Sequence, residues 1–356
     1  MKARRGVRAR RPAVRPGRRG PGAWSRLPDD ELLGIRIRDL GLRLERTPLA
    51  RPVRRLNREL AARGIELAPH CWLALEWFSP DGVPGIAVPF YLAHPRLRSL
   101  QRRCAGEAEG ANARELRRLL RHEAGHAIDT AFRLRRRADW RRTFGSASRK
   151  YPHVYRPRPG SRRFVQHLAG WYAQSHPAED FAETFAVWLA PNSAWRRRYA
   201  GWPAMRKLLW VDALMAELSG RAPPVRSRRV VEPLAEARFT LREYYERLAR
   251  RGRGRNVARI DRSLLRLFAR EREGRRRMSA ARLLRERAPV LRRRIAQRLD
   301  VSEYLVGEVV RHMIARCRSL GLRLRGPRRV AERRAERLAT AQVARAMRSF
   351  GPRLSL

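Results

Sequence analysis

The chain has few cysteines, few lysines and no long hydrophobic run. Its three cysteines, Cys71, Cys104 and Cys317, are odd in number, far apart and without a Cys-x-x-Cys pair. This pattern supports neither a disulfide framework nor a cysteine zinc site, and we expect a cytoplasmic protein in a reducing compartment. No run of about 18 apolar residues occurs, so we expect no membrane-spanning helix.

Negative charge is also scarce, and the positive charge is almost entirely arginine. The chain has 83 Lys and Arg residues against 33 Asp and Glu, which gives a formal net charge of +50 at pH 7. Lysine occurs only at Lys2, Lys150 and Lys207. So strong a preference for arginine is typical of a G+C-rich coding bias, and this weakens the argument from charge to nucleic acid. Nucleic-acid binding nevertheless stays open as a property of the basic segments.

The amino-terminal third predicts a tail followed by a small lobe. Residues 1–26 carry ten basic and no acidic side chains, interrupted by Pro and Gly, so we expect a disordered basic tail. Residues 27–111 predict a small α/β lobe, with strand-like runs at 35–45, 70–78 and 85–93 and a helix at 50–64. Pro89 predicts that the run near Ile86–Tyr91 is an edge strand or a bulged one, and an exposed edge strand can take up an extended peptide.

The rest of the chain is predicted to be helical, so the expected fold class is α+β. Residues 112–220 predict a helical lobe, with helices at 113–140, 177–190 and 202–220. Asn112 is expected to cap the first of these helices. A basic, proline-containing linker follows at 221–232, and residues 233–356 predict a basic helical region.

The sharpest motif is HEAGH at residues 122–126, within the first of these helices. Residues four apart share a helix face, so His122 and His126 can hold one zinc ion between them. Glu123 then points towards the open coordination position, where it can accept a proton from water. The alternative is an ordinary helix with two half-buried, hydrogen-bonded histidines.

A catalytic zinc needs a third protein ligand, which must come from another segment. Asp129 and Phe132 occupy the places where metzincins carry Gly and His, so that class is excluded. Glu179 and Glu183 share one face of the second helix, so one can bind the metal while the other orients a ligand histidine. The spacing does not decide between them, and His176 is a competing ligand. The alternative is a solvated acidic helix face.

Three segments together carry a family resemblance: HEAGHAID, GWYAQSHPAEDFAETFAVWL and RRRYAGWPAMRKL. They resemble the bacterial family named "putative zinc-binding metallopeptidase" and, more distantly, the catalytic domain of anthrax lethal factor, over about residues 27–250. The resemblance implies a zincin-like metallopeptidase fold with one zinc ion. It implies Glu179 as the third ligand, Glu183 as the residue that orients a histidine, and Tyr172 as a donor to the oxyanion. The amino-terminal zinc ribbon of some relatives is absent here.

We therefore predict a zinc-dependent metallopeptidase of the HExxH, glutamate-zincin type, acting on a peptide or protein. Residues 112–220 are then the helical zinc-binding catalytic lobe, with Glu123 and Tyr172 as the expected catalytic residues. Asp129 shares a face with His126, and it either bonds to a loop or ligand histidine or is a buried structural partner. The alternative is a nucleic-acid-binding or scaffold protein with a relic zinc site, acting through its basic tail and carboxy-terminal helices.

Three stretches avoid positive charge altogether: residues 64–95, 122–132 and 164–195 contain no Lys or Arg. They are the stretches predicted, on separate grounds, to supply the strands, the HEAGH motif and the Glu179 helix. Buried or metal-facing positions do not tolerate uncompensated guanidinium groups. The pattern therefore indicates that the high charge belongs to the surface around the site.

Overall fold

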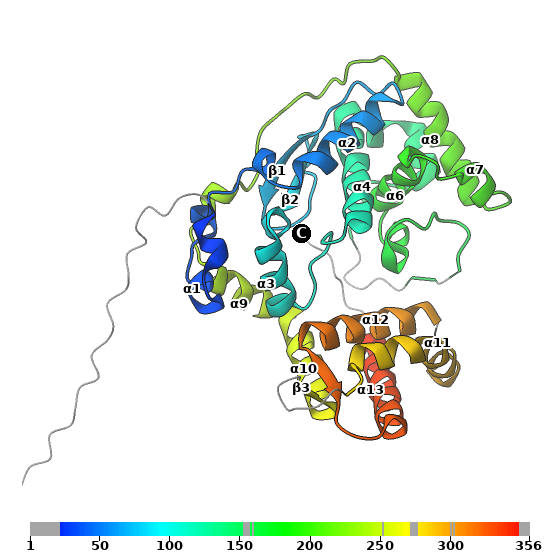
Figure 1. Ribbon diagram of the computed structural model, residues 1–356. Helices are drawn as coiled ribbons and strands as arrows, with labels where there is room; N and C mark the ends of the chain where they lie inside the picture. The colour runs from blue at the N-terminus through cyan, green and yellow to red at the C-terminus, as the bar shows by residue number, and fades with distance from the viewer. Residues whose placement is uncertain are drawn as a thin grey trace, which may run out of the picture.

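The computed structural model describes residues 22–151, 157–158, 160–250, 253–270, 277–299, 301 and 303–348. The fold is mostly helical with two small sheets, which confirms the expected α+β class (Figure 1). No described helix is long and apolar enough to cross a membrane. The helices are α1 (Asp29–Leu33), α2 (Ala50–Ala61), α3 (Pro95–Ala105), α4 (Ala113–Phe132), α5 (Ala138–Phe144), α6 (Pro177–Leu189), α7 (Trp195–Arg198), α8 (Ala204–Leu218), α9 (Leu241–Arg250), α10 (Arg253–Leu267), α11 (Ala280–Leu299), α12 (Glu303–Ser319) and α13 (Arg328–Arg348). The strands are β1 (His70–Ala74), β2 (Gly85–Pro89), β3 (Phe268–Arg270) and β4 (Leu322–Leu324).

The amino-terminal segment is more ordered than its composition predicts. Residues 1–21 of the expected tail lie outside the described residues, but residues 23–26 form a 3-10 turn. Trp24 is buried there and donates from Nε1 to the carbonyl of Leu40 at 2.9 Å. The strand expected at 35–45 is wrong, because two 3-10 turns separated by left-handed Gly41 occupy this stretch. Its alternating apolar residues are buried by these turns rather than by a sheet.

The sheet of the small lobe is a parallel pair in which β2 is buried along its length. His70 of β1 pairs with Gly85 of β2, and Ala74 pairs with Pro89. Phe78 forms an isolated antiparallel bridge with Ala87 of β2, and its carbonyl accepts a hydrogen bond from the amide of Ala87 at 2.8 Å. The structure therefore does not show the exposed edge that was expected near Ile86–Tyr91.

Helix α4 begins where the sequence predicts and ends earlier. Asn112 caps it, since its side chain accepts from the amide of Glu115 at 2.9 Å. The helix stops at Phe132 because Arg133 adopts a left-handed conformation with φ of 55°. A 3-10 turn and α5 then replace the last part of the single helix expected at 113–140. The helices expected at 177–190 and 202–220 are confirmed as α6 and α8.

The described residues form two large hydrophobic cores and a small cluster of Trp72, Ala74 and Ala87. The first contains buried residues from Trp24 to Leu248, and the second contains residues from Ile260 to Val343. Helix α9 therefore packs with the amino-terminal core. The boundary between the two cores lies between Leu248 and Ile260, beyond the linker expected at 221–232. The second core belongs to α10–α13, which lie below the α4 and α6 region in Figure 1. Buried Arg316 of α12 joins the two parts, because it pairs with Asp261 and also donates to the carbonyl of Arg102 in α3.

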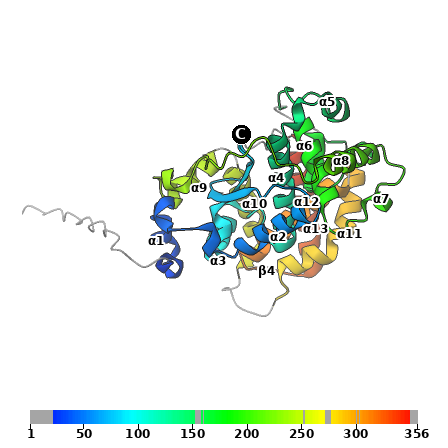
Figure 2. The ribbon, with the colours of Figure 1, turned by 90° about the horizontal axis from the view of Figure 1, so that it is seen from above.

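Helices α4 and α6 lie side by side in both views (Figure 1 and Figure 2), and Gly125 allows this close approach. A Cβ atom at Gly125 would lie 2.7 Å from Cα of Ala182, which is backbone of the neighbouring helix. Carbon atoms do not approach so closely without a shift of one element. The absence of a side chain at this position therefore sets the separation of the two helices.

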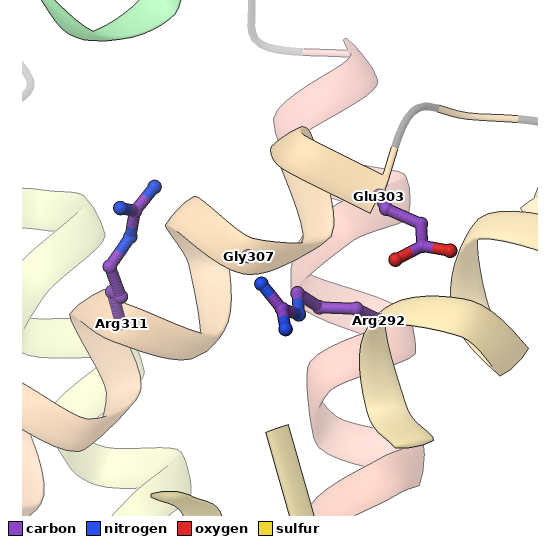
Figure 3. Close-up of a pocket in the computed structure, with 4 residues that line it drawn as sticks. All are labelled: Arg292, Glu303, Gly307 and Arg311. Atoms are coloured by element: carbon purple, nitrogen blue, oxygen red, sulfur yellow. The ribbon is translucent and has the colours of Figure 1, made fainter. Parts of the chain in front are cut away.

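A second helical glycine offers a matched contrast. Gly307 of α12 lies in a pocket of about 350 Å³, lined also by Arg292, Glu303 and Arg311 (Figure 3). A Cβ atom there would lie 3.2 Å from Cδ of Arg292, an exposed and flexible side chain. This neighbour can move aside, unlike the backbone that faces Gly125.

We predict that Gly125→Ala lowers the free energy of unfolding by about 1–3 kcal/mol, because the new methyl group overpacks the helix interface. Gly307→Ala is the control, and it should be neutral or stabilise by up to about 1 kcal/mol through helix propensity. Urea denaturation of both variants measures the two effects. Equal stability of Gly125→Ala and the wild type would contradict the close-packing argument.

Candidate metal centre

Two adjacent helices bring three metal-binding side chains together. His122 and His126 come from α4, and Glu179 comes from the first turn of α6. Glu179 Oε2 lies 3.0 Å from His122 Nε2 and 3.2 Å from His126 Nε2, and the two Nε2 atoms are 3.2 Å apart. The three donor atoms therefore form a nearly equilateral triangle.

The size and chemistry of this triangle fit a zinc ion. Ligand atoms about 2.0–2.1 Å from a tetrahedral zinc stand about 3.3 Å from one another, close to the observed separations. Two imidazoles and one carboxylate leave a fourth position open, which is the donor set of catalytic zinc sites. The group of His122, His126 and Glu179 can thus hold one metal ion.

Glu183 determines which nitrogen of His122 faces the triangle. Its Oε1 lies 3.0 Å from His122 Nδ1, and its Oε2 accepts from the amide of Leu168 at 2.8 Å. A carboxylate accepts, so Nδ1 carries the proton in the neutral ring and the Nε2 lone pair points at the metal position. The structure thus places Glu183 where the sequence analysis expects it.

The charges around the triangle favour a cation. Burial opposes an imidazolium at His122, but the hydrogen bonds that it would donate to Glu179 and Glu183 outweigh burial and raise its pKa well above the ordinary value. Burial likewise opposes a charged Glu179, yet His126 and His122 hold its pKa well below the ordinary value. A zinc ion supplies this positive charge while leaving both imidazoles neutral, as metal ligation requires.

Glu123 stands beside the triangle in a buried position, with 7 % of its surface exposed. Burial raises its pKa above the ordinary value for glutamate, and the neighbouring His122 and His126 only partly offset this effect. A carboxylate with a raised pKa is a stronger base, and a larger fraction of it is protonated near neutral pH. Its position and its basicity both suit proton transfer.

Tyr172 lies over the same histidine from a strained turn. Its ring centroid is 5.6 Å from that of His122, and burial raises the pKa of its phenol well above the ordinary value. The turn that carries it contains Gly170 and Trp171, both with positive φ. A non-glycine residue in this conformation is unfavourable, and such strain tends to occur where a functional side chain is placed.

Two other candidates have different roles from the metal ligands. Asp129 is fully buried and accepts from both the amide and Nε of Arg135 at 2.8 Å, so it is the buried structural partner of a loop arginine. It is not the partner of a ligand histidine.

His176 caps α6, because its Nδ1 accepts from the amide of Ala178 at 3.1 Å. Its Nε2 lies 2.6 Å from the carbonyl of Arg149, so neither nitrogen faces the triangle.

The structure also adds a residue that the sequence does not reveal. Tyr151 donates from its hydroxyl to Oε1 of Glu179 at 2.8 Å. It lies in a loop 28 residues before Glu179, in a stretch without periodicity or motif. No pattern of spacing identifies such a residue, since the loop conformation alone brings it to the site.

Comparison with known proteins agrees with this centre. Residues 99–196 match the model of a family described as "Putative zinc-binding metallo-peptidase", which confirms the resemblance over this segment. The segment contains all three members of the triangle together with Glu123, Glu183, Tyr151 and Tyr172. Neither the curated proteins nor the solved structures contain a match to the chain. The likeness to the lethal factor domain therefore rests on the motif alone.

We predict that zinc raises the melting temperature of protein stripped of metal by a chelator. Free zinc at about 100 times its dissociation constant adds about 2.7 kcal/mol to the stability of a folded state that binds one ion. Differential scanning fluorimetry measures the shift, and Mg²⁺ is the control because it prefers oxygen ligands. A flat response to zinc, or an equal response to Mg²⁺, would contradict the assignment of this centre.

Proposed function

We propose, from the family match over residues 99–196 and the geometry of the metal centre, that the chain is a zinc-dependent metallopeptidase that hydrolyses peptide bonds. His122, His126 and Glu179 are the zinc ligands in this proposal. The observation that carries it is the set of three donor atoms within 3.2 Å of one another beside a buried glutamate. This observation supports the HExxH, glutamate-zincin type expected from the sequence.

The side chains around the centre divide the chemistry between them. Zinc, when bound, supplies positive charge that polarises the scissile carbonyl and lowers the pKa of a water molecule. Glu123 accepts a proton from the attacking water and then delivers it to the leaving amine. Its buried position beside His122, His126 and Glu179 suits a group that must first take and then release the same proton.

Tyr172 is the second catalytic residue of the proposal. Its phenol remains protonated at neutral pH, so it can donate a hydrogen bond to the oxyanion of the tetrahedral intermediate. The positive-φ residues Gly170 and Trp171 hold it against His122 before substrate binds. Such preorganisation avoids a reorganisation cost at the moment of reaction.

Among the three residues of the triangle, His126 is the most exposed. His122 and Glu179 are buried, whereas the side chain of His126 keeps 15 % of its surface exposed. We infer that the peptide approaches from the side of His126. The buried strand β2 offers it no free edge, so substrate alignment must use other groups around the centre.

The nucleic-acid alternative draws on the arginines of the carboxy-terminal helices. Several of these arginines pair with glutamates on the same or a neighbouring helix, which reduces the charge they offer to phosphate. Arg282 and Arg328 lie 2.8 Å and 3.0 Å from Glu286, and Arg287 lies 3.7 Å from Glu332. We therefore keep peptide hydrolysis as the proposed function.

We predict that Glu123→Gln retains one zinc ion per chain and loses peptide hydrolysis, since glutamine fills the same space and cannot accept the proton. Glu179→Ala should lose the zinc ion as well, because it removes one of three ligands. Metal analysis and a proteome-wide cleavage screen, each with the wild type, measure the two properties. Full metal content in Glu179→Ala would overturn the ligand assignment, and a cleavage pattern shared by Glu123→Gln and the wild type would overturn the peptidase proposal.

A further inference from the structure

The two carboxylate oxygens of Glu179 have different partners. Oε2 faces the two histidines at 3.0 Å and 3.2 Å, whereas Oε1 accepts a hydrogen bond from the Tyr151 hydroxyl at 2.8 Å. A carboxylate can bind a metal through one oxygen or through both. The hydrogen bond to Oε1 therefore affects whether Glu179 can bind a metal ion through one oxygen or through both.

Tyr151 is held in place by its contacts with His176. The two rings are stacked, with centroids 3.9 Å apart and planes inclined by 17°. His176 Nδ1 accepts from the amide of Ala178, so Nε2 carries the proton of the neutral ring and donates to the carbonyl of Arg149 at 2.6 Å. Tyr151 through its ring and Arg149 through its carbonyl thus both contact His176, at the start of the helix that carries Glu179.

This arrangement couples the loop to α6 through a single side chain. His176 caps the helix, supports the Tyr151 ring and anchors the loop backbone. Glu179 lies three residues further on, in the first turn of the same helix. The distance from Tyr151 to the carboxylate is therefore set by short, direct contacts rather than by a flexible chain.

We propose that Tyr151 is a positioning residue that restricts Glu179 to binding zinc through Oε2 alone. The inference rests on the proposed role of Glu179 as a zinc ligand. With its hydroxyl bound to Oε1, only Oε2 is directed at the metal position. Without this bond the carboxylate is free to rotate, and its second oxygen competes for the coordination position that water and substrate need. Partners that orient a ligand are typically worth 10–100-fold in metal affinity or activity.

Tyr151→Phe tests the proposal, because it removes the hydroxyl and keeps the ring that stacks on His176. We expect zinc affinity, measured by competition with a chromophoric chelator, to fall about tenfold. Tyr172→Phe is the matched control: it removes the other phenol next to the centre, whose ring lies 5.6 Å from that of His122, whereas the hydrogen bond recorded to Oε1 of Glu179 comes from Tyr151. It should lower the turnover number and leave zinc affinity unchanged.

The visible spectrum of the cobalt-substituted protein gives a second readout that a merely structural change would not move. Four-coordinate cobalt absorbs more strongly than five-coordinate cobalt, so Tyr151→Phe should weaken the bands if the second carboxylate oxygen joins. Unchanged zinc affinity or an unchanged cobalt spectrum in Tyr151→Phe would overturn the inference. A wild-type protein that binds no zinc would instead overturn the proposed function itself, so the two failures are distinguishable.

Discussion

The close approach of α4 to α6 is the constraint on which the rest of the centre depends. His122 and His126 are four residues apart on one helix, so their relative position follows from helix geometry. The third donor comes from a different helix and reaches them only because Gly125 presents no side chain to the backbone of Ala182. Helix packing in this region therefore decides whether the motif can hold a metal.

This packing also buries the three carboxylates of α6, and each of them has its own partner. Asp180 follows Glu179 in α6, and its carboxylate pairs with Lys207 of α8 at 2.5 Å. Glu183 pairs with His122 through Nδ1. Glu179 faces both histidines and, in our proposal, the zinc ion. An uncompensated carboxylate in such a position would destabilise the fold by several kcal/mol, so a zinc ion bound as we propose would also stabilise the fold.

The absence of arginine from three stretches now has a structural explanation. The first stretch contains buried β2, and the others contain the buried faces of α4 and α6. Arg121 and Arg135 border the central region from positions just outside it, each paired with an acid: Arg121 with Glu59 at 2.7 Å, and Arg135 with Asp129 at 2.8 Å. Positive charge thus surrounds the centre without entering it.

The sequence predicts those parts of the site that depend on a repeat along one helix. The Asn112 cap, the pair His122 and His126, and the candidate pair Glu179 and Glu183 all follow from spacing on α4 or α6. Contacts that depend on the path of a loop are beyond such reasoning. Tyr151 reaches Glu179 through a loop without periodicity.

Two errors in the predicted fold have the same origin. The left-handed conformation of Arg133 ends α4 although the helical pattern continues past it. Residues 35–45 alternate like a strand, yet they fold into 3-10 turns, because their apolar side chains meet the core from both sides of Gly41. In both cases tertiary packing overrides a local pattern.

X-ray absorption at the zinc edge of the zinc-loaded wild-type protein tests the central claim most directly, since it reports the ligand atoms of the bound ion. The account predicts two imidazole nitrogens and a carboxylate oxygen at about 2.0–2.1 Å, with one further light-atom ligand from water. A sulfur ligand at about 2.3 Å, or a shell of oxygen atoms without imidazole scattering, would contradict it.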